Sequence, residues 1–359
     1  MIADLLAHVI AHPDDRDAFL VLGDALQAAG DPRGELVIVQ TQLADNPTPE
    51  LRAREAELLA RHRAAWLGEL ATLGWRDLGV EWRRGFVDLV RFGPPRYRDD
   101  VAELDFDDLI GRLARMPANE LVRVVEVGAL PPGAISWRRG IDAIARHGLP
   151  PNTCTLELHG SQSDFYEHQL ATLEPAYGRL ARLHDLVICV NGLALGELEL
   201  PALRELEHTT PGLTVANAKA IARASWPELE GLTIAIGEPG ERGCDLGPES
   251  VGAMLGELHA PKLRRLGLRS AANTDELVAA LVRLPLIGQL ESLDLAYGTL
   301  GDAGAAQLLA CTHLRALDLT HAFLGERTRD ALVAAFGARV VLDTPQSPDD
   351  DFRRPRGLD

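Results

Sequence analysis

Apolar residues recur every three or four positions over the first 70 residues, which is the spacing of amphipathic helices. The apolar faces comprise Leu5, Leu6, Val9 and Ile10; Phe19, Leu20, Leu22 and Leu26; Leu36, Val37, Val39 and Leu43; and Leu51, Leu58, Leu59 and Trp66. Gly30 suits the position after the second face, and Asp31-Pro32 suits the start of the third helix. The pattern predicts four helices, the last over residues 51–70.

The hydrophobic period shortens between residues 75 and 92. Two short apolar runs are separated by Arg84-Gly85, and they contain Val80, Trp82, Phe86, Val87, Leu89 and Val90. Such runs on either side of a glycine-containing turn are typical of two short strands in a hairpin.

An LxxLxL pattern then repeats from about residue 105. Its clearest copies are LESLDL from Leu290 and LRALDL from Leu314, and LRRLGL from Leu263 and LEGLTI from Leu229 match well. Weaker copies begin at Val122, Thr153, Leu183 and Leu203, with a remnant at Val340. Successive starts are 31, 30, 20, 26, 34, 27 and 24 residues apart. Such self-similarity predicts stacked strand–helix units.

The last two leucines of each copy are two residues apart, so they point to the same side of a short strand. Stacking buries them in one apolar column that no single unit could bury. We therefore expect an α/β solenoid with parallel strands on the concave side and helices on the convex side. The eight turn positions that follow the strands include only one asparagine, Asn191, so we expect backbone groups or water to satisfy the turn carbonyls.

The composition of the chain limits which classes of function it can have. The chain has 36 Lys and Arg against 53 Asp and Glu, a formal net charge of −17, which disfavours general binding to nucleic acid or to anionic membranes. The N-terminus lacks the features of a signal peptide, and no apolar run approaches the roughly 18 residues of a membrane span. These observations predict a cytoplasmic location.

No catalytic or metal-binding motif is present. The four cysteines lie 35, 55 and 67 residues apart without a CxxC pair, and there is no HExxH, GxSxG, GxGxxG or glycine-rich phosphate loop. His159 and His208 fall on or beside the concave strands about two repeats apart, or roughly 10 Å, too far for one metal ion. We therefore expect no enzyme, no cofactor and no metal. Cys189 is expected to point outward, where a reactive thiol stays an alternative to packing.

The repeat region resembles leucine-rich repeat proteins of the ribonuclease-inhibitor-like class, most clearly over LDLAYGTLGDAGAAQLLACTHLRALDL from Leu293. The segment LVLGDALQAAGDPRGELVIVQTQL from Leu20 looks like the bacterial repeat-companion domain, a module that precedes such repeats in myxobacterial and planctomycete proteins. WRRGFVDLV from Trp82 is similar to the segment that commonly comes after that module. The resemblance implies a solenoid that binds proteins on its concave face.

Together these patterns predict a mainly helical capping module with a small β element over residues 1–104, a solenoid over residues 105–342 and a disordered tail over residues 343–359. We expect a non-catalytic scaffold or adaptor that binds a partner protein. The alternative is a regulatory or substrate-recruiting subunit of a larger enzyme or effector complex. The oligomeric state does not follow from the sequence.

Outward-facing strand positions supply the candidate partner-binding residues. They are Glu126, Glu157, His159, Asp185, Glu205, Glu207, Arg265, Arg269, Asp294 and Asp318. The acidic members would attract a basic segment of a partner. The alternative is an ordinary solvated face of an acidic protein.

Two other charged groups have competing interpretations. Arg83, Arg84, Arg91, Arg96 and Arg98 form a basic patch that could bind an acidic partner or pair with the acidic run over residues 99–108. The helix start in GDPRGE could hold an anion, or Asp31 could cap it.

Overall fold

The computed structural model describes the chain except for residues 75, 94–104, 129–133, 161–170, 242–243 and 344–359. It divides into two compact units. The first consists of Met1–Pro131 and Asp142–Glu157, and the second of Pro132–Ile141 and Leu158–Asp359. The tail expected to be disordered lies, apart from Asp343, outside the described residues.

The first unit begins with the four helices that the sequence predicts, followed by the predicted hairpin. Its elements are α1 (Ile2–Ala11), α2 (Arg16–Ala28), α3 (Arg33–Asp45), α4 (Pro49–Leu67), the 3-10 helix η1 (Gly68–Thr72), β1 (Leu78–Arg83), β2 (Phe86–Phe92), α5 (Phe106–Ala114) and β3 (Val124–Val127). Strand β1 pairs antiparallel with β2, and β2 pairs parallel with β3, the strand of the first repeat. The hairpin thus covers the edge of the first repeat strand.

Close approach between α2 and α3 explains the GDPRGE segment. A Cβ added at Gly34 would overlap the Gly23 carbonyl oxygen and the Gln27 backbone nitrogen, so only glycine fits. Asp31 accepts a hydrogen bond from the Arg33 backbone N–H at 2.9 Å. The capping hydrogen bond that the sequence predicts for Asp31 is therefore present.

The hairpin turn packs against the same helix. Arg84 and Gly85 both have positive φ, at 48° and 83°, as a tight two-residue hairpin turn requires. A Cβ at Gly85 would overlap Val37 of α3. The Gly85 backbone N–H donates to Gln40 Oε1 at 2.7 Å, which ties the turn to α3.

Gly34→Ala should lower the free energy of unfolding of the first unit by about 1–3 kcal/mol, because the extra methyl group forces two packed helices apart. Gly111→Ala in α5 is the matched control, since its Cβ would meet only the tip of Arg115. Urea unfolding measures both variants. Equal unfolding free energies for the two would contradict the close-packing explanation.

The second unit repeats a strand and a helical segment. Its strands are β6 (Asp185–Cys189), β8 (Glu205–His208), β9 (Gly231–Gly237), β10 (Arg265–Ala271), β11 (Ser292–Asp294), β12 (Ala316–Asp318) and β13 (Val340–Val341), and they lie side by side in that order. A separate parallel pair consists of β5 (Ala171–Thr172) and β7 (Leu193–Ala194). Strand β4 (Thr155–His159) and helix α6 (Ala134–His147) cross the division between the units.

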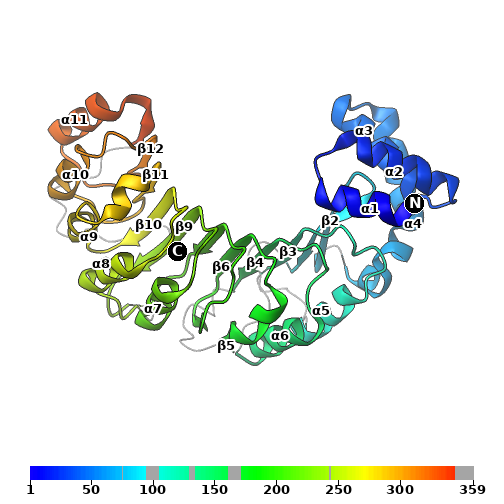
Figure 1. The fold of residues 1–359 in the computed structure, drawn as a ribbon, viewed down its shortest axis with the longest axis horizontal. Helices are drawn as coiled ribbons and strands as arrows, with labels where there is room; N and C mark the ends of the chain where they lie inside the picture. Colours follow the sequence, from blue (N-terminus) through cyan, green and yellow to red (C-terminus); the bar gives the residue numbers. More distant parts are fainter. Residues whose placement is uncertain (75, 94–104, 129–133, 161–170, 242–243, 344–359) are drawn as a thin grey trace. The chain divides into compact units, whose positions relative to one another are not determined.

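The helical segments of the second unit lie on one face of its sheet (Figure 1). They are α7 (Val215–Arg223), α8 (Pro248–Glu257), α9 (Thr274–Leu281), α10 (Asp302–Leu308), α11 (Glu326–Phe336), and the 3-10 helices η3 (Glu174–Arg179), η4 (Pro285–Gln289) and η5 (Gly337–Arg339). We call the opposite, helix-free face the concave face. The fold is the leucine-rich repeat solenoid that the sequence predicts.

Parallel register stacks equivalent leucines into one core. Leu206 pairs with Leu232, Leu232 with Leu266, Leu266 with Leu293 and Leu293 with Leu317. Each of these side chains is at most 2 % exposed. The LxxLxL assignment is therefore correct for these repeats, including the weak copy from Leu203.

Backbone groups satisfy part of the turns, as expected: the Thr299 backbone N–H donates to the Ala271 carbonyl at 3.0 Å. Side chains satisfy further turn groups. Thr274 donates its hydroxyl to the Ala271 carbonyl at 2.8 Å and accepts from the Thr299 backbone N–H at 2.9 Å. Asn217 from α7 accepts from the Leu195 backbone N–H at 2.9 Å. Hydrogen-bonding side chains thus act together with backbone groups in place of an asparagine ladder.

Candidate functional site

Register arranges the outward side chains of the concave face in rows. The first row consists of Asp185, Glu205, Gly231, Arg265, Ser292 and Ala316. The second consists of Val187, Glu207, Thr233, Gly267, Asp294 and Asp318. The next outward positions include Ala235 and Arg269, which also pair. The outward positions of these strands contain five carboxylates and two arginines, an excess of three negative charges, and Glu230 beside β9 adds a further carboxylate.

Residues with small side chains or none occupy the middle of this face. Gly231, Ala235, Gly267 and Ala296 point outward by alternation, yet they are buried by larger neighbours. Small residues therefore lie between the charged side chains of β8 and the two arginines of β10, and the Glu205 and Thr233 side chains lie over Gly231 and Gly267.

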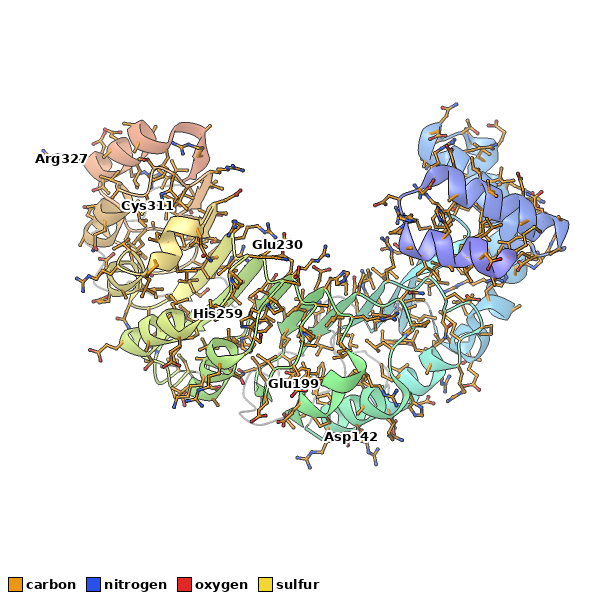
Figure 2. All side chains as sticks on the ribbon, viewed as in Figure 1. Asp142, Glu199, Glu230, His259, Cys311 and Arg327 are labelled. Carbon is orange, nitrogen blue, oxygen red and sulfur yellow. The ribbon has the colours of Figure 1, made fainter. Side chains whose placement is uncertain are left out.

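Both arginines of the face stand on β10 and reach in opposite directions. Arg265 donates to Glu205 on β8 and lies 3.7 Å from Glu230, which Figure 2 shows on the face away from α7 and α8. Arg269 donates to Asp294 on β11 at 2.6 Å. Burial alone would lower the pKa of the Arg269 guanidinium, but its hydrogen bond to Asp294 and the charges of Asp294, Glu207 and Asp318 together raise this pKa.

The acidic cluster expected from the sequence is partly neutralised within the protein. Glu126 belongs to the first unit, where it pairs with Arg91 and its side chain is only 12 % exposed. Glu157, His159 and Asp185 also have partners of their own. Glu207 accepts from the Thr209 hydroxyl at 2.8 Å, and Asp318 from the Thr320 backbone N–H at 2.9 Å.

The expected pairing of the basic patch with residues 99–108 is not what the described residues do. Arg83 pairs with Asp14 at 2.6 Å, and Arg84 donates to the Pro13 carbonyl at 2.9 Å. Arg96, Arg98 and most of the acidic run lie outside the described residues. The partners come instead from the start of the chain and from β3, because the hairpin packs between them.

His208 is not on the concave face. It occupies the last leucine position of its repeat and is 1 % exposed. Asn217 Nδ2 lies 3.3 Å from His208 Nε2, while Asn217 Oδ1 accepts from Leu195, which fixes the orientation of the amide. Nε2 is thus the acceptor and the proton is on Nδ1, which has no hydrogen-bond partner. Burial lowers the pKa of His208 to about 4.

The pKa of His208 makes the second unit less stable in acid. The unfolded chain takes up a proton near pH 6.5 and the folded chain only near pH 4, so stability is constant above pH 6.5 and falls between these values. Between pH 7.5 and pH 5 the loss should be about 2 kcal/mol. His208→Leu restores the repeat pattern and should remove this component, as urea unfolding at both pH values would measure. The same pH dependence in both proteins would contradict this assignment.

Other sites with recognisable chemistry are scarce in the described part of the chain. No group of three or more His, Cys, Asp or Glu side chains there could hold a metal ion.

A surface hollow of about 400 Å³ lies between η3 and the segment after β7, lined by Glu174, Tyr177, Glu197 and Glu199 among others. Cys189 is half-buried at the outward position that the sequence predicts, and the buried Cys244 and Cys311 have raised pKa values because of burial.

The sequence did not predict a role for two residues of this face. Glu230 precedes the strand pattern, and Gly231, although it falls at an outward position, has no side chain to suggest a role. The sequence feature that could have revealed this contact is the alignment of Glu205, Gly231 and Arg265 at the same repeat position.

Among the described residues no helix is both long and apolar enough to cross a membrane.

Comparison with known proteins supports the fold. No protein-family model and no curated protein sequence matches the chain. A crystal structure of a Bacteroides fragilis protein is 19 % identical, with a TM-score of 0.57 over 83 % of this chain and 84 % of that chain.

Two leucine-rich repeat proteins give lower TM-scores. Human 5T4, or trophoblast glycoprotein, is 23 % identical with a TM-score of 0.38 over 58 % of this chain and 86 % of its own. TLR13, crystallised in complex with ssRNA13, is 15 % identical with a TM-score of 0.37 over 71 % and 35 %.

Proposed function

We propose that the protein is a non-catalytic interaction scaffold that binds a partner protein on the concave face of its second unit. The observation that carries the proposal is the arrangement of this face over β8–β12. Charged side chains that are at least partly exposed stand in rows across these strands, so the charged groups of a partner segment could meet counter-charges held in fixed positions.

The partner would present a basic segment. Five carboxylates against two arginines leave negative charge that the face does not neutralise, and complementary charge steers association and selects partners. Glu207 and Asp318 are the leading contact residues, because each is half-buried and the hydrogen bonds that they accept come from uncharged groups. Binding by such groups weakens as salt concentration rises.

The first unit would be a repeat-companion module that acts as a cap. Solenoids need their terminal repeats covered to stay soluble, and pairing of β2 with β3 supplies that cover on one edge. The glycines that the GDPRGE and WRRGF segments place at close contacts support this assignment.

The Glu207→Arg, Asp318→Arg double variant tests the concave face. We expect a partner recovered from native lysate by the wild-type protein to be lost, or at least tenfold reduced, with the double variant. Quantitative mass spectrometry of the recovered proteins measures this, and an unchanged circular dichroism spectrum confirms folding.

Glu257→Arg with Asp330→Arg is the matched control. Both residues are exposed on convex helices, α8 and α11, and the variant has the same change in net charge. Loss of the partner in both double variants would indicate a general charge effect. Retention in the concave variant would move the binding site elsewhere on the molecule.

A further inference from the structure

The ion pair between Arg265 and Glu205 spans three strands. Glu205 on β8 and Arg265 on β10 are each paired in register with Gly231 on the strand between them. Two side chains on next-nearest strands are about 9.6 Å apart at the backbone, so they can meet only across the intervening residue. Here that residue has no side chain.

Gly231 makes the contact possible. A Cβ at this position would overlap the Glu205 carboxylate, which lies directly over the glycine. The Arg265 guanidinium completes the arrangement from the other side, with Glu230 at 3.7 Å as a second carboxylate. Arg265, Glu205 and Glu230 remain 49 %, 43 % and 46 % exposed, so the pair is accessible from the concave face.

We propose that Glu205 and Glu230, over Gly231, form a guanidinium-binding subsite that Arg265 fills in the free protein. An arginine of the partner competes with Arg265 for this subsite. The inference rests on the proposed function for its biological use, because the partner is the source of the competing arginine. The subsite itself is defined by the residues of this chain alone.

The ion pair between Arg265 and Glu205 is weak enough for a competing arginine to displace Arg265. Exposed ion pairs contribute about 0.2–1 kcal/mol, which corresponds to a factor of about 1.4 to 5 in an equilibrium constant. Arg265 therefore weakens binding of a competing arginine by no more than that factor. Arginine is favoured over lysine because its planar guanidinium can donate to two carboxylates at once.

Binding of fluorescein-labelled nona-arginine to the full chain, followed by fluorescence anisotropy, tests the subsite. Arg265→Ala should bind this peptide more tightly than wild type by a factor of about 1.4 to 5. Arg315→Ala is the matched control, because it also removes one arginine paired with a glutamate on the second unit. The affinity of Arg315→Ala for nona-arginine should rise less than that of Arg265→Ala, because this variant changes only the overall charge.

Two further measurements separate the subsite from general attraction. Gly231→Ala in the Arg265→Ala background should abolish the gain, because the methyl group displaces the Glu205 carboxylate. Labelled nona-lysine should gain less than nona-arginine from Arg265→Ala.

Equal gains in Arg265→Ala and Arg315→Ala, equal gains for both peptides, or no binding of nona-arginine to Arg265→Ala would each overturn the subsite. These results do not depend on recovery of a native partner. Failure of the lysate experiment together with a specific gain in Arg265→Ala would reject the proposed function and leave the subsite standing.

Discussion

In-register stacking of parallel strands is the constraint on which the rest of the second unit depends. The inward leucines of successive repeats must face one another to be buried, as Leu232, Leu266 and Leu293 are. Because side chains alternate along a strand, the residues between those leucines are then forced outward into rows. The meeting of Glu205 and Arg265 over Gly231 is a direct consequence of this register.

Stacking also has to satisfy the turns that join the strands to the helices. This chain does so with backbone hydrogen bonds and with threonine and asparagine side chains from the convex helices, rather than with a repeated asparagine. Thr274 bridges a carbonyl and an N–H group of neighbouring turns, and Asn217 holds the loop at Leu195. Because these partners differ between repeats, helices and spacing can vary while the strand register stays fixed.

The sequence predicted the elements well because helical period, hairpin alternation and the leucine repeat are local signals. It also predicted which positions face outward on β8–β12. It could not predict pairing: Glu126 is neutralised by Arg91 from the hairpin, and His208 occupies a leucine position in the core. Those outcomes depend on which strands become neighbours and on which side chains are near enough to bond, and neither is encoded within one repeat.

The most direct test of binding on the concave face is site-specific photo-cross-linking in native lysate. A benzophenone side chain at Thr233, which is half-buried in the second row over β9, should give a discrete cross-linked partner identified by mass spectrometry. The same group at Glu257, exposed on the convex helix α8, should not. A partner captured from Glu257 but not from Thr233 would contradict binding on the concave face.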